Sequence, residues 1–263
     1  MGQTIACANQ KGGVGKTTTV VNLATYLALA GQRLLVIDLD SQGNATSGFG
    51  IDRSSIERSV YDAVMDDAEL AELTVSTPID GVQLIPASVA LASADVELAP
   101  VNQRERRLAR LIEPIRDDYD YLLLDCPPSL GLLTVNALTA ADSVLIPIQC
   151  EYYALEGLTQ LIATLDLVRD HLNPQLAIKG VLLTMFDART NLSSDVANEV
   201  RRHLGNSVYD TVIPRNVRLS EAPSFGQPIA LYSADSRGAA AYQALGDEIL
   251  RRDGIVPAAR EVA

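Results

Sequence analysis

The sequence predicts an α/β fold, a doubly wound and mostly parallel β-sheet flanked by helices. Short apolar runs alternate with longer helical patterns along the chain, as in successive βαβ units. The runs are hydrophobic nearly throughout, which is typical of strands covered by helices on both faces. The 263 residues are enough for one large domain of this kind.

Each expected element has its own local signal. The first apolar run leads into a glycine-rich loop and a helix that ends near residue 30, where Gly31 favours the left-handed turn that closes helices. The expected strands cover residues 4–8, 33–40, 81–86, 119–128, 143–149, 178–186, 208–214 and 228–233. Further helices are expected over residues 104–115, 155–172 and about 236–252.

No linker, repeat or low-complexity segment divides the chain. We therefore expect a single domain over residues 1–253 and a loose, flexible tail over residues 254–263. No apolar run approaches the ~18 residues of a membrane span, and no basic stretch precedes the first strand. These features predict a cytoplasmic protein.

The composition restricts the partners and the cofactors. The three cysteines are widely spaced and include no CxxC pair, which argues against a disulfide framework or a zinc site. The net charge of -12 alone argues against nucleic acid as a partner. The basic residues are unusual, however, because only three are lysines and 18 are arginines. Two of the three lysines, Lys11 and Lys16, lie in the glycine-rich loop.

The loop, NQKGGVGKTTT, follows a strand and opens a helix, which is the arrangement of a phosphate-binding loop. Its glycines allow backbone N–H groups to face phosphate oxygens, and Lys16 can neutralise the β- and γ-phosphates. The Thr17 hydroxyl is placed to ligate Mg²⁺, and Thr18 to hydrogen-bond the α-phosphate. The alternative is a tight turn without a ligand. We expect ATP or ADP to contact Gly12, Gly13, Val14, Gly15, Lys16, Thr17 and Thr18.

Three carboxylates follow expected strands. Asp38 and Asp40 lie two apart and so share a face, where one can contact metal-bound water and the other can orient the attacking water. Asp125 follows four apolar residues at the end of an expected strand and is placed to reach Mg²⁺, as in a Walker-B strand. We assign Asp38 and Asp125 to the metal, partly through water, and Asp40 to catalysis. Alternatively, Asp38 or Asp40 caps the following turn.

Four segments together resemble the ParA/Soj family of chromosome- and plasmid-partitioning ATPases. They are KGGVGKTTT, DLDSQGNATSGFG, LLLDCPPSLG and IPRNVRLSEAPSFGQPI, and the similarity covers about Thr4 to Arg252. The family belongs to the P-loop NTPases of the deviant Walker-A type, which also include MinD. One departure is Ser41, where the family usually has proline, and we expect it to loosen the switch after Asp40.

The resemblance implies a role for the second lysine of the loop. In the family, two ATP-bound subunits enclose the nucleotides in a homodimer, and Lys11 is implied to contact the partner's phosphates and to assist catalysis there. Positive charge supplied in trans acts like an arginine finger. Gly12 is then required to stay small, because it lies at the close contact. The alternative for Lys11 is an ordinary solvated lysine.

The resemblance also implies a base-binding loop and a DNA-binding surface. Pro214 and Asn216 are implied to border the adenine, with the backbone around Met185 on its other side. The arginines implied to bind double-stranded DNA without sequence preference are Arg189, Arg215 and Arg218. The alternative for each is a surface salt bridge or an anchor of the nucleotide loop. The candidates for extending the patch are Arg201, Arg202 and Arg237.

A local arginine patch, doubled by dimerisation, can outweigh distant acidic residues within a Debye length of ~10 Å. We therefore expect an ATPase associated with the nucleoid, slow alone and stimulated by DNA and by a ParB-type centromere-binding partner. One alternative is a MinD-like membrane switch, which is disfavoured because the chain lacks a basic amphipathic end. Another is a positioning ATPase for a different cargo. The sequence leaves open whether the cargo is a chromosome or a plasmid.

Overall fold

A single mixed β-sheet organises the computed structural model, which describes residues 2–151 and 154–256. The described residues form eight strands in the order β3-β4-β2-β5-β1-β6-β7-β8. All neighbouring strands are parallel except the edge pair β3–β4. The strands are β1 (Gln3–Cys7), β2 (Leu34–Asp38), β3 (Val75–Ser76), β4 (Val82–Ile85), β5 (Tyr121–Asp125), β6 (Ser143–Gln149), β7 (Ala177–Phe186) and β8 (Val208–Pro214).

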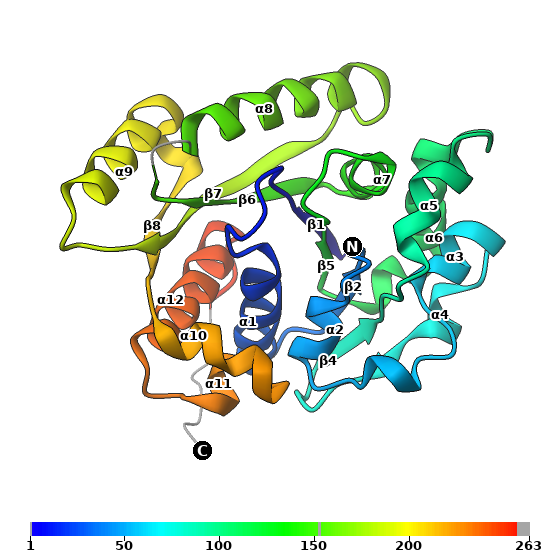
Figure 1. Cartoon of the computed structure of the whole chain (residues 1–263), viewed down its shortest axis with the longest axis horizontal. Coiled ribbons are helices and arrows are strands. Elements are labelled where there is room, and N and C mark those ends of the chain that lie inside the picture. The colour runs from blue at the N-terminus through cyan, green and yellow to red at the C-terminus, as the bar shows by residue number, and fades with distance from the viewer. Residues whose placement is uncertain (1, 152–153, 257–263) are drawn as a thin grey trace.

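Helices cover both faces of this sheet (Figure 1), so the predicted doubly wound, mostly parallel fold is confirmed. The long helices α1 and α12 lie on one face, and α7, α8 and α9 lie on the other. The helices are α1 (Lys16–Leu29), α2 (Asn44–Gly48), α3 (Val60–Asp66), α4 (Leu70–Leu73), α5 (Leu91–Leu98), α6 (Arg107–Ile112), α7 (Leu132–Ala140), α8 (Ala154–His171), α9 (Asn191–Leu204), α10 (Val217–Glu221), α11 (Ile229–Tyr232) and α12 (Arg237–Arg252).

The two faces hold two separate hydrophobic cores, and β5 shows how one strand serves both. Leu122 and Leu124 belong to the core under α7 and α8, whereas Tyr121 and Leu123 belong to the core under α1 and α12. Successive side chains of a strand point to opposite faces, so a strand between two helical layers is apolar at every position. This explains the uninterrupted apolar runs of the sequence.

The register of the central strands brings the expected carboxylates together. β1 lies between β5 and β6, the point at which the strand order reverses and where ligands of such sheets bind. Asp38 at the end of β2 pairs with Asp125 at the end of β5, and Asp125 also pairs with Cys7 of β1. The three strands therefore end side by side, next to the glycine-rich loop.

One expected strand is wrong. Residues 228–233 were expected to be extended, but Ile229–Tyr232 form the single helical turn α11. Pro228 precedes the turn and its carbonyl accepts hydrogen bonds from the N–H groups of Leu231 and Tyr232. The side chain of Asn22, from α1, accepts the N–H of Ile229 at 2.7 Å. A long-range cap, not visible in the local pattern, therefore stabilises this helical turn.

Smaller differences concern element lengths. The expected helix over 104–115 is divided into a 3₁₀ turn, the short helix α6 and a second 3₁₀ segment that contains Pro114, because proline cannot donate a helical hydrogen bond. The short antiparallel strand β3 was not expected. Part of the predicted loose tail, residues 257–263, lies outside the described residues; before it, the N–H of Ile255 still bonds the carbonyl of Leu250 at 2.8 Å.

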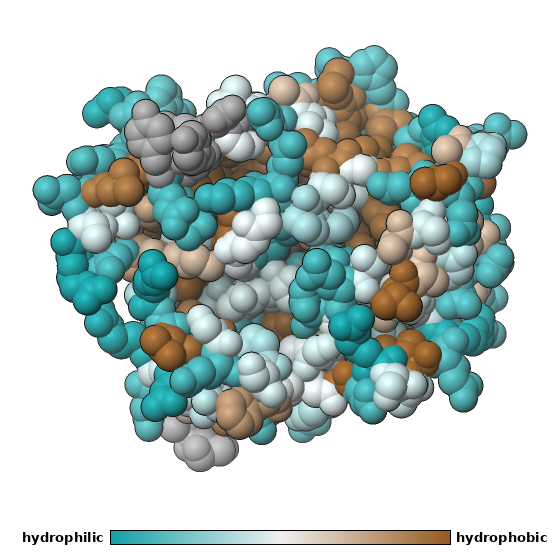
Figure 2. Space-filling model, in the orientation of Figure 1, coloured by the Kyte–Doolittle hydropathy of each residue, from teal (hydrophilic) through white to brown (hydrophobic). Residues whose placement is uncertain are grey.

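The surface is mostly hydrophilic on the face shown in Figure 2, with apolar side chains gathered mainly near α7 and α8. Among the described helices, none has the length and apolar character needed to cross a membrane.

Candidate active site

The glycine-rich loop connects β1 to α1 and is held from the sides by neighbouring strands. Gly13 and Gly15 adopt positive φ angles of 73° and 91°, which glycine accepts without steric cost. The Thr184 hydroxyl of β7 donates to the carbonyl of Val14 at 2.8 Å, and the Asn9 side chain donates to the carbonyl of Pro147 at 2.7 Å. The loop therefore has a defined shape before any ligand binds.

The first turn of α1 is suited to an anion. Its N-cap residue is Gly15, which supplies no capping side chain, and the first turn carries no acidic residue. The N-terminal N–H groups and the helix dipole therefore remain available to phosphate. A cavity of about 280 Å³ opens at this point. Its lining includes Gly12, Gly13, Gly15, Lys16, Thr17, Thr18, Asp40, Pro128 and Met185.

The two loop lysines have different environments. Lys16 is only 7% exposed, and its Nζ donates to the carbonyl of Lys11 at 3.3 Å. The Lys11 side chain is 38% exposed and lies outside the cavity lining, where its Nζ pairs with Glu151 Oε2 at 3.2 Å. Gln149 holds the other oxygen of Glu151 at 2.6 Å. Lys16 thus lines the cavity, whereas Lys11 lies outside it and pairs with Glu151.

Asp125 is a buried carboxylate without a hydrogen-bond partner among the described residues. Burial, reinforced by the charge of Asp38, raises its pKa well above the ordinary value, while the nearby Thr17 hydroxyl and the Lys16 charge act in the opposite direction. An orphaned carboxylate oxygen beside a hydroxyl fits a divalent cation. Within the described ranges, no group of three or more His, Cys, Asp or Glu side chains is placed to hold a metal ion.

Asp38 and Asp40 differ although both are buried. Asp38 accepts the N–H and the hydroxyl of Thr46 at 2.8 and 2.7 Å, and the N–H of Asp40 at 3.2 Å. Its contacts therefore fit the capping alternative, and burial raises the pKa of Asp38 to about 6 despite these bonds. Asp40 accepts the N–H of Gln42 at 2.9 Å and lines the phosphate cavity. Thr46 was not among the expected site residues, because its spacing from Asp38 carries no signal.

A second hollow, of about 340 Å³, adjoins the phosphate cavity and brings together the three residues expected at the base. Met185, Pro214 and Asn216 all line it. Met185 has a φ of 50°, which is uncommon for a residue with a side chain and often occurs at functional sites. Tyr242 of α12 also lines this hollow and was not expected; its hydroxyl lies 3.2 Å from that of Thr19.

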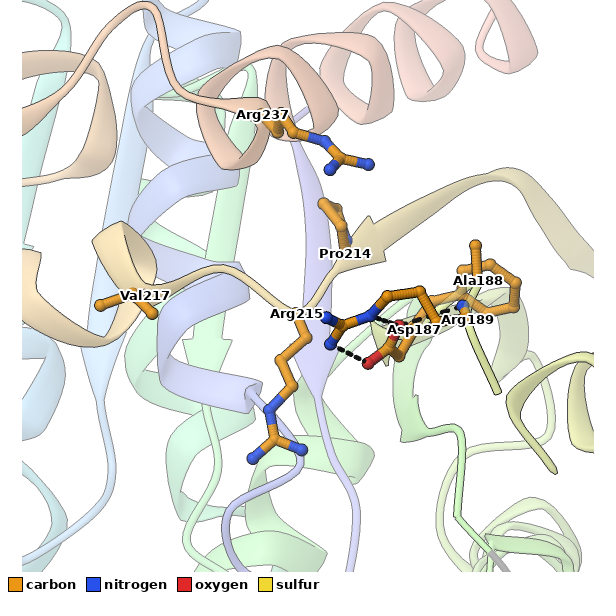
Figure 3. A pocket seen from close by; sticks show the side chains of 8 residues that line it. Asp187, Ala188, Arg189, Pro214, Arg215, Val217 and Arg237 are labelled. Atoms are coloured by element: carbon orange, nitrogen blue, oxygen red, sulfur yellow. Dashed lines mark hydrogen bonds and ion pairs between the residues drawn. The ribbon is translucent and has the colours of Figure 1, made fainter. Parts of the chain in front are cut away.

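A third hollow, of about 400 Å³, contains two of the three expected DNA-binding arginines (Figure 3). Arg189 and Arg215 line it together with Arg237, which was a candidate for extending the patch. Arg218 does not line it and pairs with Glu221 at 2.9 Å. Arg201 and Arg202 do not line it either. Arg201 lines a separate hollow near Arg252, and Arg202 pairs with Glu199.

Comparison with known proteins identifies the family. A family model described as an AAA domain matches residues 2–178. The chain is 57% identical over 249 residues to the sporulation initiation inhibitor protein Soj of Bacillus subtilis, which covers 95% of this chain and 98% of that protein. It is 52% identical over 263 residues to the chromosome partitioning protein ParA of Myxococcus xanthus, covering 100% and 93%. The chain belongs to the ParA/Soj family of chromosome-partitioning ATPases.

Solved structures support the P-loop ATPase architecture of this ParA/Soj chain. A cobyrinic acid a,c-diamide synthase from Mycobacterium smegmatis, crystallised with an ATP analogue and magnesium, aligns with a TM-score of 0.85 and 36% identity. The alignment covers 98% of this chain and 100% of that one. The whole sheet and both helical layers are therefore shared with a nucleotide-bound protein.

Proposed function

We propose that this ParA/Soj chain hydrolyses ATP with Mg²⁺, dimerises around ATP and binds duplex DNA without sequence preference. In this proposal it segregates a chromosome or plasmid together with a ParB-type partner. The observation that carries the proposal is the division between the two loop lysines. Lys16 is buried at the chain's own phosphate site, whereas Lys11 lies at the rim and is accessible to a second subunit.

The phosphate site supplies the binding and orientation needed for phosphoryl transfer. The loop N–H groups and Lys16 would hold the phosphates, and Thr17 and Asp125 would hold Mg²⁺. The oxygens of Asp38 already accept hydrogen bonds from Thr46 and Asp40, so Asp38 would contribute negative charge beside the metal and would not be a direct ligand. Bound Mg²⁺ neutralises charge on the β- and γ-phosphate oxygens. Asp40 lines the cavity and is buried, so its carboxylate can orient the attacking water. Met185, Pro214 and Asn216 enclose the base in the adjoining hollow.

Dimerisation follows from the charge of the two lysines. Two subunits that bring Lys11 side chains toward each other's phosphate sites would repel without triphosphate between them. ATP supplies the compensating negative charge, and hydrolysis removes part of it. In the single chain, a Cβ atom on Gly12 would meet only Pro128, at 3.7 Å, so the fold of one subunit does not itself require glycine there. A partner backbone at this point explains the glycine.

Size-exclusion chromatography with and without ATP tests the dimer. We expect a shift to the dimer in ATP, and Asp40→Ala should trap this species because the attacking water loses its orienting carboxylate. If neither the unaltered protein nor the Asp40→Ala variant dimerises in ATP, the sandwich model is wrong.

Binding to random-sequence duplex in ATP, at rising salt, tests the DNA surface. We expect affinity to fall steeply with salt, because each neutralised phosphate releases counterions. Arg189→Ala and Arg218→Ala should weaken binding, whereas Arg33→Ala, at the opposite end of the sheet, serves as the matched control. Affinity that is unchanged in the first two variants would remove Arg189 and Arg218 from the interface. A basic N-terminal peptide of a ParB-type partner should then raise the hydrolysis rate.

A further inference from the structure

The third hollow is lined by three arginines and one carboxylate. We call it the arginine pocket and define it by Asp187, Arg189, Arg215 and Arg237, which line it together with Pro214. In Figure 3, Arg237 at the start of α12 lies on the far side of Pro214 from the Asp187–Arg189 pair, and the side chain of Arg215, just after β8, extends away from that pair. Among the residues that the structure describes, neither Arg215 nor Arg237 forms an ion pair.

The Asp187–Arg189 pair has the geometry that arginine uses for phosphate. Arg189 Nε and Nη2 donate to the two carboxylate oxygens of Asp187 at 2.8 and 2.7 Å, forming a two-pronged fork. The same planar fork binds two oxygens of a phosphate group. The side chain of Arg189 is otherwise 86% exposed, so one carboxylate occupies the hydrogen-bonding edge of an accessible arginine.

The charged groups of the arginine pocket also favour the binding of an anion. Hydrogen bonds from Arg189, aided by the charge of Arg215, hold the pKa of Asp187 below its usual range, so this carboxylate is ionised at neutral pH. Three cations and one anion leave the pocket with a surplus of positive charge. A second anion is therefore favoured here, even though the protein as a whole is acidic.

We propose that the arginine pocket takes one phosphodiester group of duplex DNA, and that Asp187 occupies the position of that phosphate in the DNA-free protein. This proposal rests on the proposed DNA binding and adds a way in which the protein itself limits that binding. A phosphate must compete with Asp187 for the Arg189 fork, so this carboxylate weakens binding by each subunit. Two subunits on one duplex overcome this cost together, which makes binding depend on dimerisation.

The pocket also shares a wall with the base-binding hollow. Pro214 and Arg215 line both, and the N–H of Arg215 bonds the carbonyl of Phe186 at 3.0 Å. A change at this wall on nucleotide binding would therefore reach the Arg215 side of the pocket directly.

Asp187→Asn tests the inference, because it removes the charge and keeps an oxygen for the turn that binds the N–H of Arg189. We expect duplex DNA to bind about two- to fivefold more tightly at low salt, since an exposed ion pair no longer competes. The slope of log affinity against log salt should become steeper by about one unit, because one more arginine exchanges counterions. Asp187→Ser removes the same charge and should change both quantities in the same direction.

Asp120→Asn is the matched control. Asp120 accepts the same kind of fork from Arg33, whose Nε and Nη2 donate to its two carboxylate oxygens at 3.3 and 3.0 Å, but it lies at the opposite end of the sheet. The net charge changes equally in both variants, and DNA affinity should change only in the Asp187 variants. Equal tightening in Asp120→Asn would overturn the inference in favour of a general charge effect.

The Arg189→Ala background completes the test. With Arg189 removed, Asp187→Asn should no longer tighten DNA binding. The inference is overturned if Asp187→Asn still tightens binding in this background, or if it does not tighten binding when Arg189 is present. Either result would leave the proposed DNA binding itself intact. If the unaltered protein fails to bind duplex at any salt, the proposed function itself falls. Thermal unfolding of each variant verifies that the fold is retained.

Discussion

The two ends of the central sheet differ in whether their buried charged groups have partners within the chain. At the amino end, Lys179 donates to Gln3 at 2.7 Å and pairs with Asp253, which also accepts the Tyr121 hydroxyl at 2.7 Å. These charges are about nine-tenths buried and fully matched within the chain. At the carboxyl end, Asp125 is buried without a partner among the described residues, and Lys11 is only loosely paired.

This difference separates charged groups that stabilise the fold from charged groups that, under the proposed function, bind a ligand. A matched buried cluster anchors the end of α12 to the strands and leaves no group free for a ligand. An unmatched buried carboxylate destabilises the ligand-free protein and is tolerated where a cation completes it. Variants at the two ends should therefore separate stability from activity.

The largest expected effect is on hydrolysis. Lys11→Ala should lower the rate about a thousandfold, the loss typical of a positive charge supplied in trans, and should weaken dimerisation. ATP affinity of the monomer, measured by calorimetry, should stay within a few-fold. Lys16→Ala is the control in the same loop and should abolish this monomer binding instead. Loss of monomer ATP binding in Lys11→Ala would place Lys11 in its own subunit's site.

The next effect is on stability at the amino end. Lys179→Ala should lower the free energy of unfolding by about 3 kcal/mol, because it leaves Asp253 buried without its cation. Urea unfolding measures this change. ATP turnover at low temperature should be unaffected, since the cluster lies at the opposite end of the strands from the phosphate loop. A loss of turnover in folded Lys179→Ala would show that the two ends are not separable.

A smaller effect of opposite sign is expected at Asp125. Asp125→Asn should stabilise the nucleotide-free protein by about 1 kcal/mol, because it removes an unpaired buried charge. It should also remove the dependence of ATP binding on Mg²⁺. Asp253→Asn makes the same chemical change in the matched cluster and should destabilise. Urea unfolding that shows equal destabilisation in both variants would contradict the comparison.

The smallest effect concerns the rim of the loop. Glu151→Gln should increase ATP-dependent dimerisation about twofold, since exposed ion pairs such as Lys11–Glu151 contribute little. Sedimentation in ATP measures the dimer. Glu72→Gln, which disrupts the exposed pair with Arg58, controls for net charge. Weaker dimerisation in Glu151→Gln would mean that Glu151 helps Lys11 reach the partner.

Residues near one another in sequence were the predictable ones. The glycine loop and the carboxylates after the strands are local signals, and the structure places Lys16, Thr17 and Asp40 around one cavity. The misassigned segment at Pro228 depends on Asn22, more than 200 residues away in sequence. Likewise, the hydrogen bond from Thr46 to Asp38 could not be predicted, because an aspartate after a strand has the same local pattern whether it caps a turn or faces a metal.

By itself the sequence determined the fold class, the phosphate loop and the family, because apolar period, glycine placement and short motifs are properties of neighbouring residues. Some ion pairs are local, such as Arg189–Asp187, but others depend on the tertiary structure. Glu151 reaches Lys11 across 140 positions, and Arg237 at the start of α12 lines the same hollow as Arg189 and Asp187, which lie in the turn between β7 and α9. These pairings arise from the way strands and helices pack, so the charge balance of each site becomes visible only in the folded chain.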